Sequence, residues 1–141
     1  VEPFLASSSL VGIMAQRLVR RLCEACKEPV VPTEGELSQL GYDRDRFLRE
    51  TPGHVYRAVG CQECLDSGYR SRTGIFELLV VDEELRQHIM QNVDSNTLKK
   101  YAAAKGMTTL RDDGARKVML GETTIEEVFR VTQDETLDYQ E

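Results

Sequence analysis

The segments Cys23-Glu24-Ala25-Cys26 and Cys61-Gln62-Glu63-Cys64 hold all four cysteines of the chain. A Cys-x-x-Cys pair can place two thiolates on one metal ion, and two such pairs complete a tetrahedral shell of four sulfurs. A shared ion would tie together two stretches of backbone that the segment from Lys27 to Gly60 separates. The sequence therefore predicts one metal site with four ligands, which are Cys23, Cys26, Cys61 and Cys64.

Zinc is the ion that this pattern favours. Two disulfides in a secreted domain and an iron–sulfur cluster are the alternatives. The tight pairs on a wide spacer, in a chain without a signal-peptide pattern, favour a metal over disulfides. A thioredoxin-like redox role would need a strand before a pair and a helix that starts at it, and neither pair has that pattern. A closed shell of four sulfurs leaves no position for a substrate, so we expect the zinc to be structural.

Four thiolates around Zn²⁺ leave a formal charge near −2. We expect nearby cations to offset part of this charge, and the candidates close in sequence are Arg21, Lys27, Arg70 and Arg72. Backbone N–H groups next to the cysteines should donate hydrogen bonds to the sulfurs and orient them.

The composition places limits on the class of protein. With 141 residues, 40% of them hydrophobic, the chain can form one domain or two small modules. Its net charge of −6 argues against nucleic acid as the main partner, because phosphate binding needs a concentrated positive surface. No apolar run approaches the roughly 18 residues of a membrane span. The start, Val1 to Leu5, lacks both an initiator Met and a signal-peptide pattern, and we interpret the chain as a piece of a longer protein.

A helix from Pro3 to Leu22 is expected before the first cysteine pair. Its apolar residues recur at helical spacing and form one stripe, made of Phe4, Val11, Met14, Leu18 and Leu22. The last turn carries Arg17, Arg20 and Arg21, which suit the negative end of a helix dipole. A contact with a nucleotide or with a neighbouring subunit is the alternative role of these arginines.

Between the cysteine pairs the sequence predicts two short helices and a strand. Thr33 to Glu36 has the pattern of a capping box, which would open a helix that ends at Gly41. Asp43 to Glu50 is expected to form a second helix, and His54 to Val59 a short strand. After the second pair, Ile75 to Val81 is expected to be a buried strand.

Helices are expected from Asp82 onwards. Asp82 should cap the first, Ser95 the second, and Thr108 or Thr109 the third. Thr124 and Glu127 have the spacing of another capping box. The fold class is thus mixed α+β and mostly helical. A zinc-binding module (residues 23–74) is inserted between an N-terminal helix (1–22) and a strand with a C-terminal helical bundle (75–132), and an acidic tail (133–141) is expected to be frayed.

No catalytic constellation is recognisable. The chain lacks a Gly-x-x-x-x-Gly-Lys-Ser/Thr phosphate loop and a Gly-x-Ser-x-Gly elbow. His54 and His88 are too few and too scattered to propose as metal ligands. We therefore expect no catalytic residue in this chain.

Several segments taken together resemble one family. Val1 to Leu10, Ala15 to Arg20, the paired cysteines and Gly68 to Leu79 are similar to the C-terminal part of bacterial type II secretion ATPases, also called general secretion pathway protein E. Type IV pilus assembly ATPases are relatives and share much of this pattern. The likeness spans about Val1 to Thr132.

This resemblance implies a zinc site at the four cysteines, within the C-terminal part of a larger ATPase. It implies a parent that is a cytoplasmic homohexamer, docked at the inner membrane on other components of the secretion system. There, hydrolysis of ATP with Mg²⁺ drives assembly of a pseudopilus and export of proteins. The nucleotide-binding segments of the family precede the part that resembles this chain, so this chain alone is expected to be inactive.

Two functions follow for the chain itself. The first is a zinc-containing part of such an ATPase, which serves subunit packing or partner docking. The second is a free-standing zinc-ribbon module that binds a protein or a nucleic acid, with Arg70 and Arg72 beside one cysteine pair in its support. The acidic balance and the lack of aromatic residues among basic ones count against nucleic acid.

Overall fold

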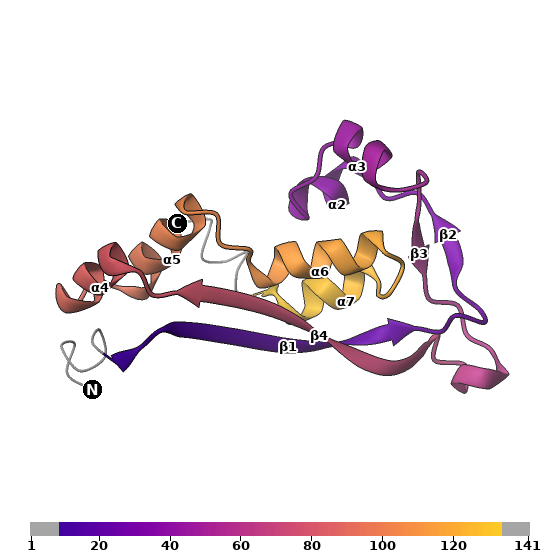
Figure 1. Cartoon of the computed structure of the whole chain (residues 1–141). Coiled ribbons are helices and arrows are strands. Elements are labelled where there is room, and N and C mark those ends of the chain that lie inside the picture. Colours follow the sequence, from indigo (N-terminus) through magenta and orange to yellow (C-terminus); the bar gives the residue numbers. More distant parts are fainter. Residues whose placement is uncertain (1–8, 134–141) are drawn as a thin grey trace. The chain divides into compact units, whose positions relative to one another are not determined.

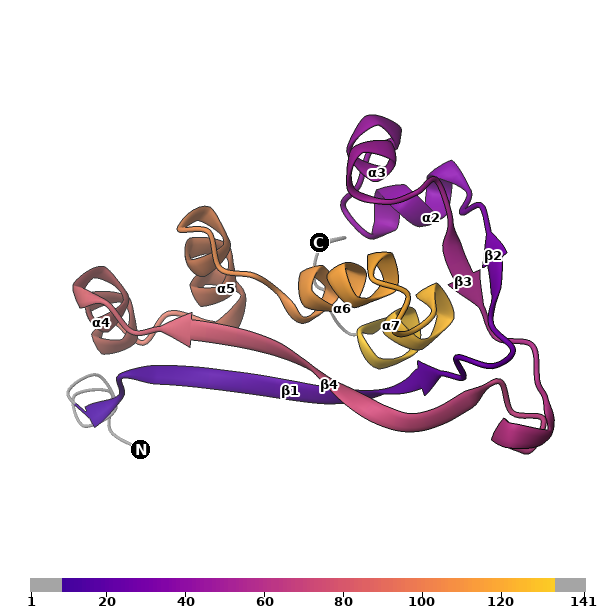
Figure 2. The ribbon, with the colours of Figure 1, turned by 45° about the vertical axis from the view of Figure 1, so that its right-hand side comes forward.

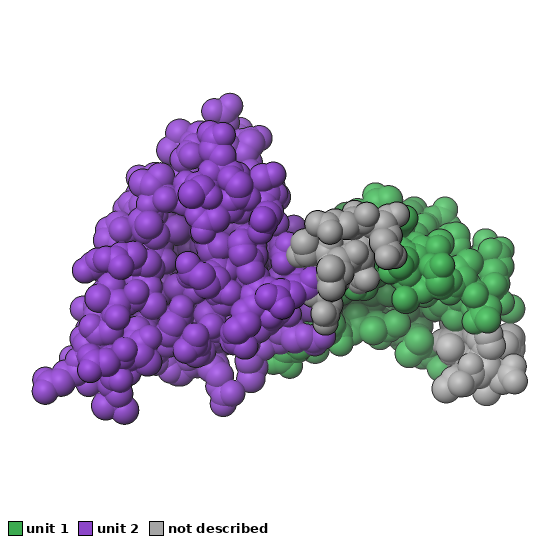
Figure 3. All heavy atoms as spheres, turned by 180° about the vertical axis from the view of Figure 1, so that it is seen from behind, with its two compact units in different colours: residues 1–16, 76–109 green, residues 17–75, 110–141 purple. Residues whose placement is uncertain are grey.

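The computed structural model describes residues 9–133 and has a mixed α/β fold (Figure 1). The described residues contain six α-helices and four strands, so the expected mixed class of α and β elements is confirmed. The chain divides into two compact units. Unit 1 comprises residues 1–16 and 76–109, and unit 2 comprises residues 17–75 and 110–141 (Figure 3). Residues 1–8 of the expected N-terminal helix and residues 134–141 of the expected tail lie outside the described residues.

The expected helix before the first cysteine pair is wrong over its described part. Gly12–Leu22 forms strand β1, which pairs with the long strand β4, Tyr69–Val80, in a two-stranded sheet (Figure 1). The apolar spacing that suggested a helix is also compatible with a strand. Pairing with β4, which lies 47 to 68 positions later in sequence, decides between the two, and no local window contains that information.

The strand expected at Ile75 is confirmed and is longer than expected, since it begins at Tyr69. The expectation that it is buried is wrong for most of its length, because Ile75 is fully buried but Phe76, Leu78 and Val80 are exposed. A second small sheet joins β2, Glu28–Val30, to β3, Val55–Arg57, in antiparallel register. In this register Pro29 lies opposite Tyr56. The sheet therefore begins just after the first cysteine pair and ends just before the second.

Two short helices lie between β2 and β3, as predicted. Helix α2, Glu34–Gln39, opens with the expected capping box, in which the Thr33 hydroxyl accepts from the backbone N–H of Glu36 at 3.1 Å and the Glu36 carboxylate accepts from the N–H of Thr33. Helix α3, Arg44–Glu50, is capped by Asp43. Each helix contributes a fully buried side chain, Leu37 and Phe47 respectively.

Unit 1 contains helices α4, Glu83–Met90, and α5, Ser95–Ala104. Asp82 caps α4 as expected, whereas Asp94 and not Ser95 caps α5. The Tyr101 hydroxyl on α5 donates to Asp82 at 3.3 Å and to Glu84, which ties the two helices together.

The last two helices, α6 (Leu110–Met119) and α7 (Ile125–Val131), lie side by side in unit 2 (Figures 1 and 2). They pack closely because Gly114 has no side chain, and a Cβ atom there would lie 2.6 Å from Val128 Cγ1. Helices α2, α3, α6 and α7 and strand β3 share one hydrophobic core, made of Leu37, Leu40, Phe47, Val55, Ala115, Val118, Ile125 and Val128. The segment between the cysteine pairs is thus packed on the C-terminal helices.

Candidate metal centre

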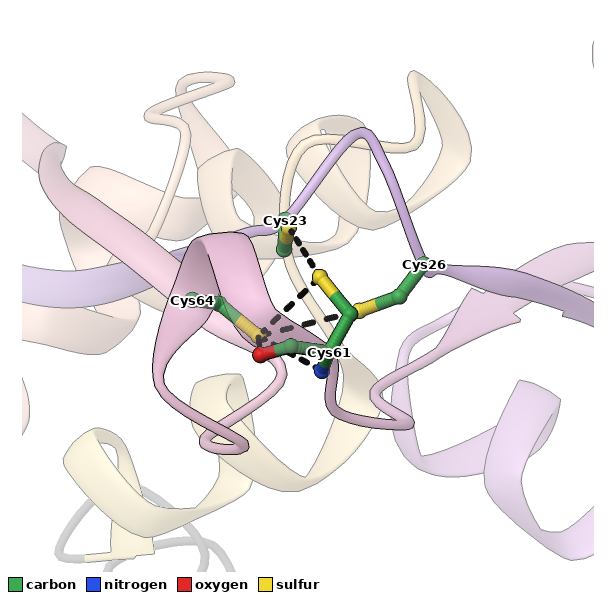
Figure 4. A group of neighbouring side chains, drawn as sticks. All are labelled: Cys23, Cys26, Cys61 and Cys64. Atoms are coloured by element: carbon green, nitrogen blue, oxygen red, sulfur yellow. Dashed lines mark hydrogen bonds between the residues drawn. The ribbon is translucent and has the colours of Figure 1, made fainter.

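The four cysteines converge from two turns (Figure 4). Cys23 follows directly on β1, and a tight turn brings Cys26 beside it, with the N–H of Lys27 donating to the Cys23 carbonyl at 3.1 Å. Cys61 caps a single turn of 3₁₀-helix, η1, Gln62–Cys64, and Cys64 is the last residue of this turn. The N–H of Cys23 donates to the carbonyl of Gly68 at 3.0 Å, so the two turns are joined at their bases.

The sulfur atoms have the spacing of a tetrahedral site. The Sγ–Sγ distances are 3.8 Å for Cys23 and Cys61 and 3.8 Å for Cys26 and Cys64, and all four sulfurs lie within 4.8 Å of one another. Zinc–sulfur bonds of about 2.3 Å in a tetrahedron require sulfur separations of about 3.8 Å. A disulfide needs about 2.05 Å, and all four cysteines are free in this structure. The four predicted ligands therefore fit a zinc ion.

Backbone N–H groups donate to the sulfurs, as expected. Gly60 donates to Cys26 Sγ at 3.3 Å, and both Cys61 and Gly68 donate to Cys64 Sγ at 3.2 Å. These donors depend on backbone that bends sharply. Gly60 has φ +124°, and a Cβ atom there would lie 2.9 Å from the Asp66 carbonyl oxygen, so this position requires glycine.

The thiols differ in acidity. Burial opposes ionisation of Cys64, but the N–H groups of Cys61 and Gly68 outweigh it and lower its pKa to about 6. Burial raises the pKa of Cys26 to about 11. A bound divalent cation would favour the ionised form of the thiols, since metal ligation requires thiolates.

Three of the four basic residues expected to offset the thiolate charge are paired with carboxylates. Lys27 pairs with Glu24 at 3.0 Å, and Arg70 pairs with Glu63 at 3.7 Å. Arg21 lies 3.9 Å from the Glu122 carboxylate. The expected offset of thiolate charge by these cations stays a prediction, since each shares its charge with a carboxylate. The backbone N–H groups are the donors that reach the sulfurs directly.

Neither histidine joins the cluster. The His54 ring lies against Tyr56, and the His88 ring against Tyr101. Within residues 9–133, the four cysteines are the single group of three or more side chains of ligand type that could hold a metal ion.

A buried carboxylate next to this region was missed from the sequence. Glu127 on α7 is 2% exposed and accepts from the Arg20 backbone N–H at 2.9 Å, from the Arg20 guanidinium at 2.8 Å and from the Arg130 guanidinium at 2.9 Å. Burial opposes its ionisation, but the two guanidinium groups and the N–H outweigh it and lower its pKa to about 2.

The expected capping box at Thr124 is therefore only half formed. The Thr124 hydroxyl accepts from the N–H of Glu127 at 3.2 Å, but the Glu127 carboxylate binds the arginines and not the helix N-terminus. Arg20 does not compensate a helix dipole. It binds Glu127 and lies over the Tyr69 ring, 4.1 Å from its centroid. The only sequence signal for Glu127 was its position three residues after a capping threonine. That spacing indicated a contact with the helix N-terminus and not with Arg20.

Comparison with known proteins shows the family. The family model described as type II/IV secretion system protein matches residues 1–130. The chain belongs to the type II/IV secretion system protein family. This confirms the family that the resemblance indicated.

Members of the type II/IV secretion system protein family from several bacteria are similar to the chain over nearly all of its length. Type II secretion system protein E of Pseudomonas aeruginosa is 48% identical over 96% of the chain. Type II secretion system ATPase E of Vibrio cholerae is 46% identical over 95%, and type IV pilus assembly ATPase PilB of Thermus thermophilus is 44% identical over 94%. The chain spans 26%, 25% and 14% of these three relatives, respectively. Among the described helices, none is long and apolar enough to cross a membrane.

Proposed function

We propose that this chain is a zinc-stabilised, C-terminal part of a type II secretion ATPase. The observation that carries the proposal is the convergence of four sulfurs at zinc-site spacing in a chain that is nearly half identical to secretion ATPases over almost its full length. In this proposal Cys23, Cys26, Cys61 and Cys64 hold one structural Zn²⁺, and residues 23–74 form the metal module.

The zinc would join two segments that carry little apolar packing of their own. Cys26 and Cys61 are only half-buried, and Leu65, directly after the 3₁₀ turn, is 89% exposed. With its four protein ligands the ion would have no open position, so its role is to hold the two turns together and not to activate a substrate.

The parent protein would supply the chemistry. We propose that it binds ATP and Mg²⁺ through segments outside this chain, assembles as a homohexamer in the cytoplasm at the inner membrane, and drives pseudopilus assembly with other secretion components. This chain would contribute to subunit packing or partner docking and would not hydrolyse ATP by itself. We propose a type II machine rather than a pilus machine because relatives at 48% and 46% identity are named for type II secretion.

Metal analysis of the purified chain tests the site. We expect about one zinc per chain, and four thiols that react with a thiol reagent only after a chelator removes the metal. The paired substitution Cys61→Ser with Cys64→Ser should abolish zinc binding, whereas Ser67→Ala, on the same turn, should retain it. Two disulfides without metal, or iron with visible absorbance, would overturn the zinc assignment.

Complementation with the full-length parent tests the machine. In a strain that lacks the parent gene, the intact protein should restore export of proteins to the medium, and the paired cysteine variant should not. Restoration of surface pili without export would assign the chain to a pilus machine. Robust ATP hydrolysis by the 141-residue chain alone would contradict its proposed inactivity.

A further inference from the structure

The turn between α6 and α7, residues 120–124, contacts the backbone on both sides of the first cysteine pair. Before the pair, the N–H of Leu22 donates to the Glu122 carbonyl at 2.9 Å, and the Thr123 hydroxyl donates to the Arg20 carbonyl at 2.8 Å. After the pair, the Lys27 ammonium donates to the Gly121 carbonyl at 3.0 Å. The turn thus holds the two ends of the segment that carries Cys23 and Cys26.

The same turn also reaches the segment after the second cysteine pair. The Thr124 hydroxyl shares a hydrogen bond of 2.9 Å with the Tyr69 hydroxyl. Tyr69 follows Gly68, whose N–H donates to Cys64 Sγ and whose carbonyl accepts from the N–H of Cys23. All of these residues belong to unit 2. One turn is therefore linked to both halves of the sulfur cluster.

The turn itself has little freedom to move. Thr123 is fully buried and Thr124 is 1% exposed. Gly121 has φ +79° and lies so close to Tyr56 that a Cβ atom would be 3.0 Å from the ring. The Lys27 ammonium lies 4.3 Å from the centroid of the same ring. The turn is held by packing against Tyr56 and by hydrogen bonds to the end of β1 and to Lys27.

We propose that the α6–α7 turn positions the cysteine pairs for the metal, so that zinc affinity and the order of the C-terminal helices are coupled. This inference rests on the proposed zinc site. Partners that are hydrogen-bonded directly to metal ligands typically change affinity 10- to 100-fold when they are removed. The turn holds the backbone next to the ligands, so we expect an effect near the lower end of this range. Coupling is reciprocal, so bound zinc must stabilise the turn to the same extent as the turn favours zinc.

Thr123→Val tests the positioning role, because it keeps the shape of the side chain and removes the hydroxyl that holds the Arg20 carbonyl. We expect zinc affinity, measured by competition with a coloured chelator, to fall about tenfold. Thr123→Ser should restore it. Thr132→Val is the matched control, since Thr132 is 1% exposed and its hydroxyl binds the Val128 carbonyl at the other end of α7. It should leave zinc affinity within about threefold, whatever it does to thermal stability.

Hydrogen–deuterium exchange of the unaltered chain tests the reciprocal effect without any substitution. Adding zinc to the metal-free protein should slow exchange in residues 117–128 much more than in α4 of unit 1. Three results overturn the inference. If the unaltered chain binds no zinc, the proposed site fails and this inference fails with it. If it binds zinc but Thr123→Val and Thr132→Val lower affinity equally, or zinc leaves exchange in 117–128 unchanged, only the positioning role fails.

Discussion

Replacing Glu127 with glutamine removes the negative charge that joins β1 to α7. The carboxylate accepts from the Arg20 backbone N–H, the Arg20 guanidinium and the Arg130 guanidinium, and it is 2% exposed. A glutamine amide keeps one acceptor oxygen, but its NH₂ group would point at N–H donors. At least one of the present hydrogen bonds must therefore be lost in addition to the charge.

The size of the effect follows from the pKa. Lowering the pKa of Glu127 from 4.5 to about 2 corresponds to roughly 3 kcal/mol at 1.36 kcal/mol per unit. Breaking a buried ion pair can cost about 3–5 kcal/mol when it leaves a buried charge unpaired. Here the remaining arginines are 48% and 58% exposed, so water can solvate them. We expect a loss of about 2–3 kcal/mol in the free energy of unfolding of unit 2.

The pH dependence has a defined sign. Because folding lowers the pKa of this carboxyl, its stabilisation is fully present above pH 4.5 and is lost as the pH falls towards 2. The difference in unfolding free energy between the unaltered chain and Glu127→Gln should therefore be constant from pH 8 to pH 5.5. It should begin to shrink near pH 4.5.

Urea unfolding of the zinc-loaded protein, followed by circular dichroism at several pH values, measures this difference. Glu126→Gln is the matched control, because Glu126 is the exposed neighbour on the same helix and the substitution is chemically identical. It should change stability by less than about 0.5 kcal/mol. Two results would refute the assignment of the low pKa to the arginine contacts. One is an equal loss of unfolding free energy for the two substitutions, and the other is a loss for Glu127→Gln that already shrinks between pH 8 and pH 6.

Three further predictions concern packing, capping and the metal. Gly114→Ala should lower the unfolding free energy by about 1–3 kcal/mol in a urea titration, because its Cβ would overlap Val128, and a Val128→Ala background should recover part of the loss. Thr33→Ala should cost about 1 kcal/mol, because it leaves the N–H of Glu36 without its cap, and Thr33→Ser should retain most of the stability in thermal unfolding. Chelation of zinc should unfold residues 27–60, since structural zinc contributes about 10–16 kcal/mol, as much as the whole stability of a typical domain. Unchanged proteolysis of that segment after chelation would contradict this last prediction.

Features whose cause lies within a few residues were predictable from the sequence. The spacing of each Cys-x-x-Cys pair restricts its chemistry, and the predicted capping residues Thr33 and Asp82 act within one helical turn. The family was recognisable for the same reason, since its motifs are contiguous segments of sequence. The N–H groups of Cys61 and Gly68, which donate to Cys64 Sγ from within four positions, belong to the same local geometry.

The tertiary structure alone decided what depends on distant partners. The segment Gly12–Leu22 has an apolar pattern that suits either a helix or a strand, and pairing with β4 selects the strand. Glu127 has the spacing of a capping residue, but Arg20, 107 positions away, takes its carboxylate. In both cases the local preferences for the two alternatives differ by about 1 kcal/mol or less, whereas the pairing with a distant residue is worth more. The short segment that shows the local pattern does not include this distant partner, so it cannot decide between the alternatives.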